Sequence, residues 1–157
     1  MYFQLFNLAG LGIAGWALMI FLPGWSATKW IARSRIFPIY LTVLYTVGVL
    51  PLIASKPGIV AEFGSPDRVL RLLASADAAL VVWIHVLVFD QLVGVWIYRD
   101  NMRKRVVPTL VQSLILFLTL MFGPVGFLVY YVIRVMQKRR PTPSDGLATY
   151  VLGDPFD

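Results

Sequence analysis

Four long apolar runs constrain this chain more than any other feature of its sequence. They cover residues 5–22, 37–54, 77–98 and 110–135. About 20 apolar residues suffice for an α-helix to cross about 30 Å of hydrocarbon. The chain is 59% hydrophobic and 14% charged, whereas soluble domains are about 45–50% apolar and about 25% charged. The sequence therefore predicts an all-α membrane protein whose four transmembrane helices form one bundle.

The connecting segments carry further signals. Ser65-Pro66-Asp67 has the pattern of a helix start, with serine as the N-cap, proline at the first helical position and a carboxylate in the first turn. A short amphipathic helix is therefore expected at about residues 66–74, lying in the membrane interface. We expect residues 1–135 to form one transmembrane domain and residues 136–157 to form a basic, then polar, tail. The first run lacks the basic n-region of a signal peptide, so a retained helix is expected.

The net charge of +6 does not indicate nucleic-acid binding, because the 14 Lys and Arg residues lie at the ends of the apolar runs. There they are expected to contact membrane lipids. With four spans the bases divide evenly between the two sides, so the sequence sets no orientation. The start of the chain does not resemble an organelle transit peptide, which favours a multi-pass protein of the bacterial inner membrane.

Gly10-Leu11-Gly12-Ile13-Ala14-Gly15 matches the letters of a dinucleotide-binding fingerprint. That motif needs a preceding strand and a βαβ unit, which a membrane-spanning helix does not provide. The small residues instead predict close helix packing, with Gly10 and Ala14 one turn apart.

The third run contains two ionisable residues, His85 and Asp90, and Asp77 stands at its start. A charged residue at the centre of a membrane helix costs roughly 2.5–3.5 kcal/mol on insertion scales, so it usually has a partner or a function. His85 has three open interpretations: a polar contact between helices, proton transfer, or ligation of a haem or chlorophyll metal. Met102 or Met121 would be the second ligand of a haem. Otherwise we predict no cofactor and no metal site, since the chain has no cysteine and one histidine.

His85 and Asp90 lie about 140° apart around a helix, so they are not expected on one face. Either they line different walls of one cavity, or Asp90 forms an ion pair with Arg99 or with a base from another helix. Asp77 would complement the helix dipole at the first turn or contribute to the rim of the same cavity.

Aromatic residues in the apolar runs are candidates for contact with a long, flat, apolar ligand, although they can also fill helix interfaces. The predicted ligand-binding residues are Trp83, Phe89, Trp96, Tyr98, Arg99 and Phe122.

Three blocks of sequence carry a resemblance to a known family. Residues 79–90 contain Trp83-Ile84-His85 and Asp90, residues 96–100 read Trp-Ile-Tyr-Arg-Asp, and residues 120–128 contain Pro124-Val125-Gly126. With these blocks the chain resembles the small four-helix membrane proteins related to the plant abscisic-acid-deficient-four protein, which is needed to form neoxanthin. By position, the resemblance points to Asp77, His85, Asp90, Tyr98, Asp100 and Pro124 as shared residues.

The resemblance implies a membrane protein of carotenoid metabolism that acts on a xanthophyll-type polyene. Converting an epoxy-xanthophyll into an allenic alcohol is a redox-neutral rearrangement that needs an acid at the epoxide oxygen and a base at a carbon-bound proton. A cofactor-free isomerase, or intramolecular oxidoreductase, using His85, Asp90 and Asp77 would meet that need. The alternative is a non-catalytic carotenoid-binding protein or an assembly subunit of an oligomer or a larger pigment–protein complex.

Overall fold

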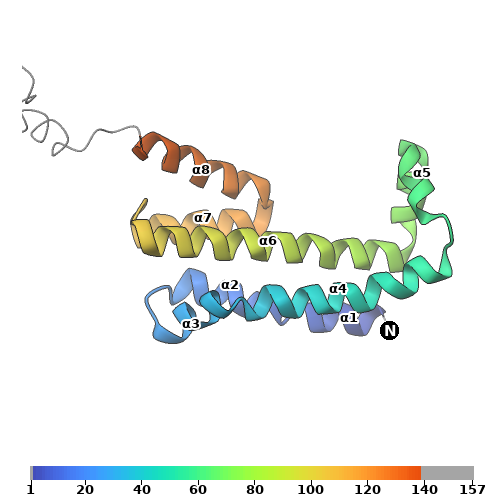
Figure 1. Ribbon diagram of the computed structural model, residues 1–157, viewed down its shortest axis with the longest axis horizontal. Helices are drawn as coiled ribbons and strands as arrows, with labels where there is room; N and C mark the ends of the chain where they lie inside the picture. The colour runs from blue at the N-terminus through green and yellow to red at the C-terminus, as the bar shows by residue number, and fades with distance from the viewer. Residues whose placement is uncertain (1, 139–157) are drawn as a thin grey trace, which may run out of the picture.

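The computed structural model describes residues 2–138. All regular secondary structure assigned in this range is helical (Figure 1). The elements are α1 (Tyr2–Ala9), α2 (Gly12–Phe21), α3 (Ser26–Ser34), α4 (Ile36–Ser55), the 3-10 helix η1 (Ile59–Gly64), α5 (Pro66–Ala74), α6 (Ala76–Lys104), α7 (Thr109–Phe122) and α8 (Pro124–Lys138). The predicted all-α class is confirmed for these residues. The predicted tail, 136–157, lies outside the described residues except for its first three.

Three segments are long and apolar enough to cross a membrane: Phe3–Phe21, Ile36–Ser55 and Ala76–Lys104. They identify an integral membrane protein. The third segment, α6, has 29 residues and is therefore about 44 Å long at 1.5 Å per residue. It continues six residues beyond its predicted end. The apolar run marks only the part of a helix that crosses the hydrocarbon core, about 30 Å thick, and the charged last turns can extend beyond that core as a helix.

The first predicted span, 5–22, is interrupted. It consists of α1 and α2, which meet at Gly10-Leu11. Backbone hydrogen bonds between residues three apart, such as Ile13 N–H to the Gly10 carbonyl (3.0 Å), connect the two helices across the break. The glycines pack as expected, but through different positions. Gly12 and Gly15 are buried, whereas Gly10 and Ala14 are exposed. A Cβ at Gly15 would lie only 2.7 Å from the Gln91 amide nitrogen and 2.7 Å from the Phe37 ring, so glycine at this position allows the close approach of α6 and α4.

The fourth predicted span, 110–135, is not one spanning helix. It divides into α7 and α8, of 14 and 15 residues, so each is only about 21–23 Å long. Figure 1 shows α7 running back along α6 and α8 folding over it. The Arg134 guanidinium near the end of α8 lies 2.7 Å from the Asp100 carboxylate near the end of α6. The α7–α8 hairpin therefore returns to the end of the molecule where it starts.

Two glycines allow the hairpin to close. Gly123 has a φ of +21°, which L residues rarely adopt, and a Cβ at this position would overlap the Asp90 carboxylate. A Cβ at Gly126 would overlap Thr119 on α7. The prediction of one span was wrong because a 26-residue apolar run can form one long helix or two half-length helices, and hydropathy is the same for both.

The hairpin also changes the distribution of charge. Nine bases of the described chain belong to elements at the end of the molecule where α6 finishes: Lys29, Arg33, Arg35, Arg99, Arg103, Lys104, Arg105, Arg134 and Lys138. Three lie at the opposite end: Lys56, Arg68 and Arg71. The even division that four spans imply does not hold, because Arg134 moves to the side of Asp100.

Two short helices flank the spans. The predicted interfacial helix is present as α5, which begins at Pro66 with Ser65 as its N-cap residue. Its Leu72 packs into a small core with Leu52, Ala78 and Val81. The helix α3 was not predicted. Its sequence is short, amphipathic and too polar to form an apolar run, and it follows the Pro23-Gly24 turn that ends the first predicted helix.

The main core joins α2, α6, α7 and α8. Trp16 is 2% exposed, and its ring lies directly against Gly94 on α6, where a Cβ would overlap it. Tyr98, also 2% exposed, donates a hydrogen bond to the Pro23 carbonyl (2.6 Å) and ties α6 to the end of α2. These contacts hold one face of α6 inside the bundle and leave the opposite face uncovered.

Candidate functional site

The uncovered face of α6 carries a continuous row of side chains. We call this row the α6 stripe; its members are His85, Phe89, Leu92, Trp96 and Arg99. Their spacing alternates between four and three residues, which keeps them on one side of a helix. All five are exposed in the structure, with Phe89 at 55% and Trp96 at 38%. Trp96 also packs against Phe127 and Tyr130 of α8, with ring centroids 5.7 Å apart in both pairs. The outer side of the stripe is left open to lipid or a ligand.

His85 lies between two aromatic rings on this stripe. Its ring centroid is 5.1 Å from that of Tyr45 on α4 and 4.8 Å from that of Phe89 one turn further along α6. Both distances fall in the range of favourable aromatic contacts. No side-chain hydrogen bond of the described residues involves the imidazole, so packing against aromatic rings fixes its position.

Asp90 lies on another side of α6, half-buried against the junction of α7 and α8. Its carboxylate contacts the backbone at Gly123, immediately before α8 begins. A carboxylate at a helix N-terminus is favourable because it faces the positive end of the helix dipole. Neither ion pair within residues 2–138 includes Asp90, so the predicted pair with Arg99 is not formed. The structure does not bring Asp90 and His85 together.

The other predicted site residues are dispersed. Asp77 is exposed in the first turn of α6, about 12 Å from His85 along the helix axis. Trp83 and Phe122 are 51% and 63% exposed but lie off the α6 stripe. Tyr98 is in the core, where its hydroxyl is already bonded to Pro23. Of the predicted ligand-binding residues, the stripe contains Phe89, Trp96 and Arg99.

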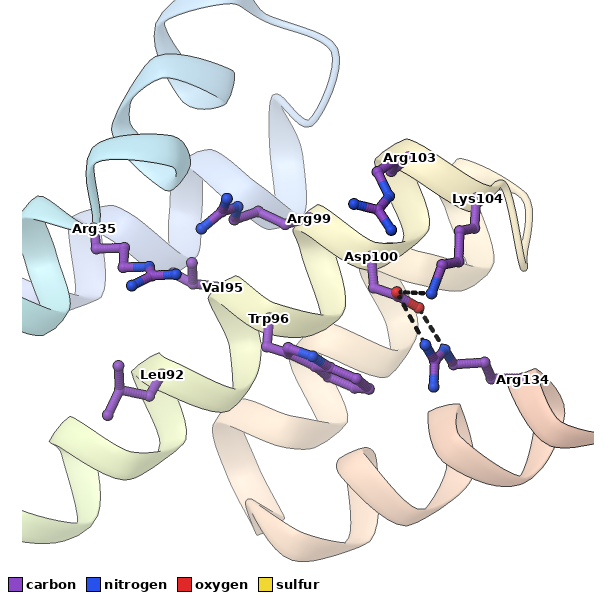
Figure 2. A pocket seen from close by; sticks show the side chains of 9 residues that line it. All are labelled: Arg35, Leu92, Val95, Trp96, Arg99, Asp100, Arg103, Lys104 and Arg134. Atoms are coloured by element: carbon purple, nitrogen blue, oxygen red, sulfur yellow. Dashed lines mark hydrogen bonds and ion pairs between the residues drawn. The ribbon is translucent and has the colours of Figure 1, made fainter.

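A cavity of about 560 Å³ opens at the end of the stripe, beside the charged C-terminal turns of α6; Figure 2 shows its lining side chains. Its lining residues are Arg35, Leu92, Val95, Trp96, Arg99, Asp100, Arg103, Lys104 and Arg134. Five of the nine are cationic and one is a carboxylate, so the lining has a net charge of +4. Arg35 comes from the junction of α3 and α4, and Arg134 comes from α8. We call this space the basic cavity.

Asp100 organises one wall of the basic cavity. Its carboxylate accepts hydrogen bonds from the Lys104 ammonium (2.7 Å) and the Tyr130 hydroxyl (3.0 Å), and the Arg134 Nε lies 2.7 Å away. The Arg134 guanidinium also lies 5.4 Å from the centre of the Trp96 ring, as a cation–π contact. Asp100 thus pairs with both Lys104 and Arg134, balances one of their two charges, and connects α8 to α6.

The remaining cations of the basic cavity have no such partner. Among residues 2–138, no ion pair and no side-chain hydrogen bond involves Arg35, Arg99 or Arg103. Figure 2 shows the side chains of Arg35 and Arg99 extending toward one another, with the Arg35 guanidinium beside Val95 and with Leu92 below both. Their mutual repulsion is uncompensated within the described residues.

The geometry limits which side chains could bind a metal together with His85. Within residues 2–138, no group of three or more His, Asp or Glu side chains is close enough to hold a metal ion. Met102, a candidate second haem ligand, lies about 26 Å from His85 along the helix axis. One iron therefore cannot bind both of these side chains.

Sequence reasoning missed several residues of the stripe and the cavity. Leu92 and Arg103 follow His85 in the same steps of four and three residues, so the spacing alone would have found them. Arg35 and Arg134 could not have been found this way, because only the tertiary fold brings α3 and α8 to the end of α6.

Comparison with known proteins adds one finding. Neither a curated protein nor a solved structure matches the chain. The model of the family described as ABA DEFICIENT 4-like matches residues 1–130. This match covers most of the 157 residues, including α1 to α7, the α6 stripe and Asp100. The earlier resemblance is confirmed, and the chain belongs to the ABA DEFICIENT 4-like family.

Proposed function

We propose that this protein binds a xanthophyll-type polyene along the α6 stripe and isomerises it with His85. Membership in the ABA DEFICIENT 4-like family supports a carotenoid-related function. The observation that carries the proposal is the position of His85, which is the one imidazole in the sequence and stands on an exposed, aromatic face of a membrane-spanning helix.

The stripe suits a long, flat, apolar ligand. Phe89, Leu92 and Trp96 follow His85 on the same face, and His85 and Trp96 are about 17 Å apart along the helix axis. Aromatic rings contribute large apolar contact areas and stack on other π systems. A polyene lying along α6 would contact these rings while its other side faced the lipid.

His85 can perform the rearrangement of an epoxide end group by itself if the steps are consecutive. The neutral imidazole removes a proton from the carbon next to the epoxide, and the released electron pair forms a new carbon–carbon double bond as the carbon–oxygen bond opens. The imidazolium then returns the same proton to the alkoxide oxygen. Substrate and product have the same atoms and electrons, so no oxidant or reductant is needed.

In this proposal the two carboxylates act outside the reaction. Asp90 stabilises the α7–α8 junction through its contact with Gly123, and Asp77 complements the N-terminal end of α6. Tyr45 positions the imidazole by packing against its ring.

The test is to incubate the purified protein in lipid nanodiscs with a panel of epoxy-xanthophylls and to separate the products by chromatography. His85→Gln should retain bound pigment and lose turnover. Val86→Gln is the matched control, because it places the same amide on the adjacent exposed position of α6, off the stripe. Turnover by the His85→Gln protein at the unmodified rate would refute a role for the imidazole.

A non-catalytic carotenoid-binding protein is the second candidate function. The separation of Asp90 from His85 favours it, because no carboxylate stands beside the imidazole to share the proton transfers. This candidate predicts that pigment co-purifies with the protein and remains unchanged over the whole panel. It also predicts that Trp96→Ala weakens binding, because the ring is part of the stripe.

A further inference from the structure

The basic cavity has a charge that its own residues do not balance. Its lining has a net charge of +4, and Arg35, Arg99 and Arg103 are without ionic partners within residues 2–138. Like charges around one cavity repel each other, and the repulsion is stronger beside a low-dielectric membrane than in water. An anion in the cavity would convert this repulsion into attraction.

The type of side chain indicates the type of anion. Guanidinium groups are planar, stay charged, and present paired donors that match the oxygens of phosphate and carboxylate. Arg35, Arg99 and Arg103 approach the cavity from two different elements. A phosphate group carries enough oxygens to bond several of these groups at once.

The other side of the cavity is apolar. Leu92, Val95 and Trp96 line it, and Leu92 and Trp96 continue into the α6 stripe toward Phe89. The cavity therefore joins a cationic end, at the level where α6 leaves the hydrocarbon, to an exposed apolar face within it. This combination fits an amphiphile with an anionic head and a hydrocarbon tail. Basic pockets between membrane helices are known to hold anionic headgroups.

We propose that the basic cavity binds the phosphate group of an anionic amphiphile through Arg35, Arg99 and Arg103, with the hydrocarbon tail lying on Leu92 and Trp96. The ligand is either an anionic membrane phospholipid or a free phosphate that shares its chemistry. This site shares Leu92 and Trp96 with the surface proposed above for the polyene. It does not include His85, so phosphate binding and isomerisation can be tested separately.

The experiment measures binding to the full chain, purified in an uncharged detergent, by native mass spectrometry and thermal shift. The probes are phosphatidylglycerol, phosphatidylcholine and inorganic phosphate. We expect phosphatidylglycerol to bind at least about tenfold more tightly than phosphatidylcholine, whose positive choline group meets the arginines. Competition by inorganic phosphate would assign the site to the phosphate group alone. Its failure to compete would assign the site to the lipid.

Two double variants separate the cavity from general charge effects. Arg35→Gln/Arg99→Gln should weaken phosphatidylglycerol binding by at least about tenfold. Arg68→Gln/Arg71→Gln removes two exposed bases of α5 at the other end of the molecule and should leave binding unchanged. Equal binding by the two double variants, or equal binding of both lipids to the unmodified protein, would overturn the proposal.

A second measurement does not depend on the lipid. If the arginines repel each other without a ligand, Arg35→Gln/Arg99→Gln should raise the melting temperature in lipid-free detergent and reduce the stabilisation by phosphatidylglycerol. A lower melting temperature without lipid, combined with unchanged stabilisation by lipid, would show that these residues serve folding and not anion binding.

Discussion

Asp100 is the residue whose replacement should affect the hairpin most. Its side chain is 10% exposed and contacts Lys104, Tyr130 and Arg134, of which the last two belong to α8. We predict that Asp100→Asn loosens α8 from α6, because asparagine removes the charge that pairs with Arg134. It also leaves one acceptor oxygen where two are now used.

The expected loss follows from the exposure of each partner. Lys104 is 33% exposed and is paired at i,i+4, so its contribution is about 0.3–0.5 kcal/mol. Arg134 is 18% exposed, and Tyr130 also bonds the carboxylate. Hydrogen bonds to a charged group contribute about 1.5–3 kcal/mol each, of which asparagine would retain part. The free energy of unfolding should therefore fall by about 2–4 kcal/mol.

The assay is reversible denaturation in detergent micelles, followed by tryptophan fluorescence. A double-mutant cycle with Arg134→Gln isolates the pair, and we expect a coupling energy of about 1.5 kcal/mol or more. Lys104→Gln is the control, with an expected loss of about 0.5 kcal/mol or less. A coupling energy below about 0.5 kcal/mol would show that Asp100 and Arg134 contribute to stability independently of each other. It would refute the prediction that their ion pair holds α8 against α6.

Two further predictions concern packing and orientation. Gly94→Ala should destabilise the protein by about 1–3 kcal/mol, because the new methyl group would overlap the Trp16 ring. Gly64→Ala, in open space, should change stability by about 0.5 kcal/mol or less in the same denaturation assay. The excess of bases at the α3 end predicts that this end faces the cytoplasm. Since the chain has no cysteine, single cysteines at Ser26 and Ala61 can be tested with a membrane-impermeant maleimide, and only Ala61→Cys should react in intact cells. Labelling at Ser26 alone would reverse the orientation.

Local sequence rules predicted much of the fold. Hydropathy placed the helices that became α4 and α6, because the apolar content of a segment decides whether it can enter a membrane. The start of α5 at Pro66 followed from Ser65 as N-cap residue and from proline at the first helical position. The exclusion of a nucleotide site at Gly10–Gly15 followed from the lack of a preceding strand.

The candidate site was predicted only in part. His85, Phe89, Trp96 and Arg99 were selected because ionisable and aromatic residues stand out within an apolar run. Their spacing places these four on one face of a helix, but the sequence did not reveal that this face is exposed. That face is defined by what covers the remainder of α6, including the contact of Trp16 with Gly94, which connects segments far apart in the chain.

The sequence by itself determined that this is a helical membrane protein and which residues could carry its chemistry, because hydropathy, helix caps and side-chain type are local properties. The tertiary structure alone decided that the last apolar run folds back as a hairpin. An apolar run has the same hydropathy whether it crosses the membrane as one helix or folds back as two. The fold-back depends on the close approach of Gly123 to Asp90 and on the ion pair between Arg134 and Asp100. The same return moved Arg134 to the end where Arg35 and Arg99 lie, which created the basic cavity.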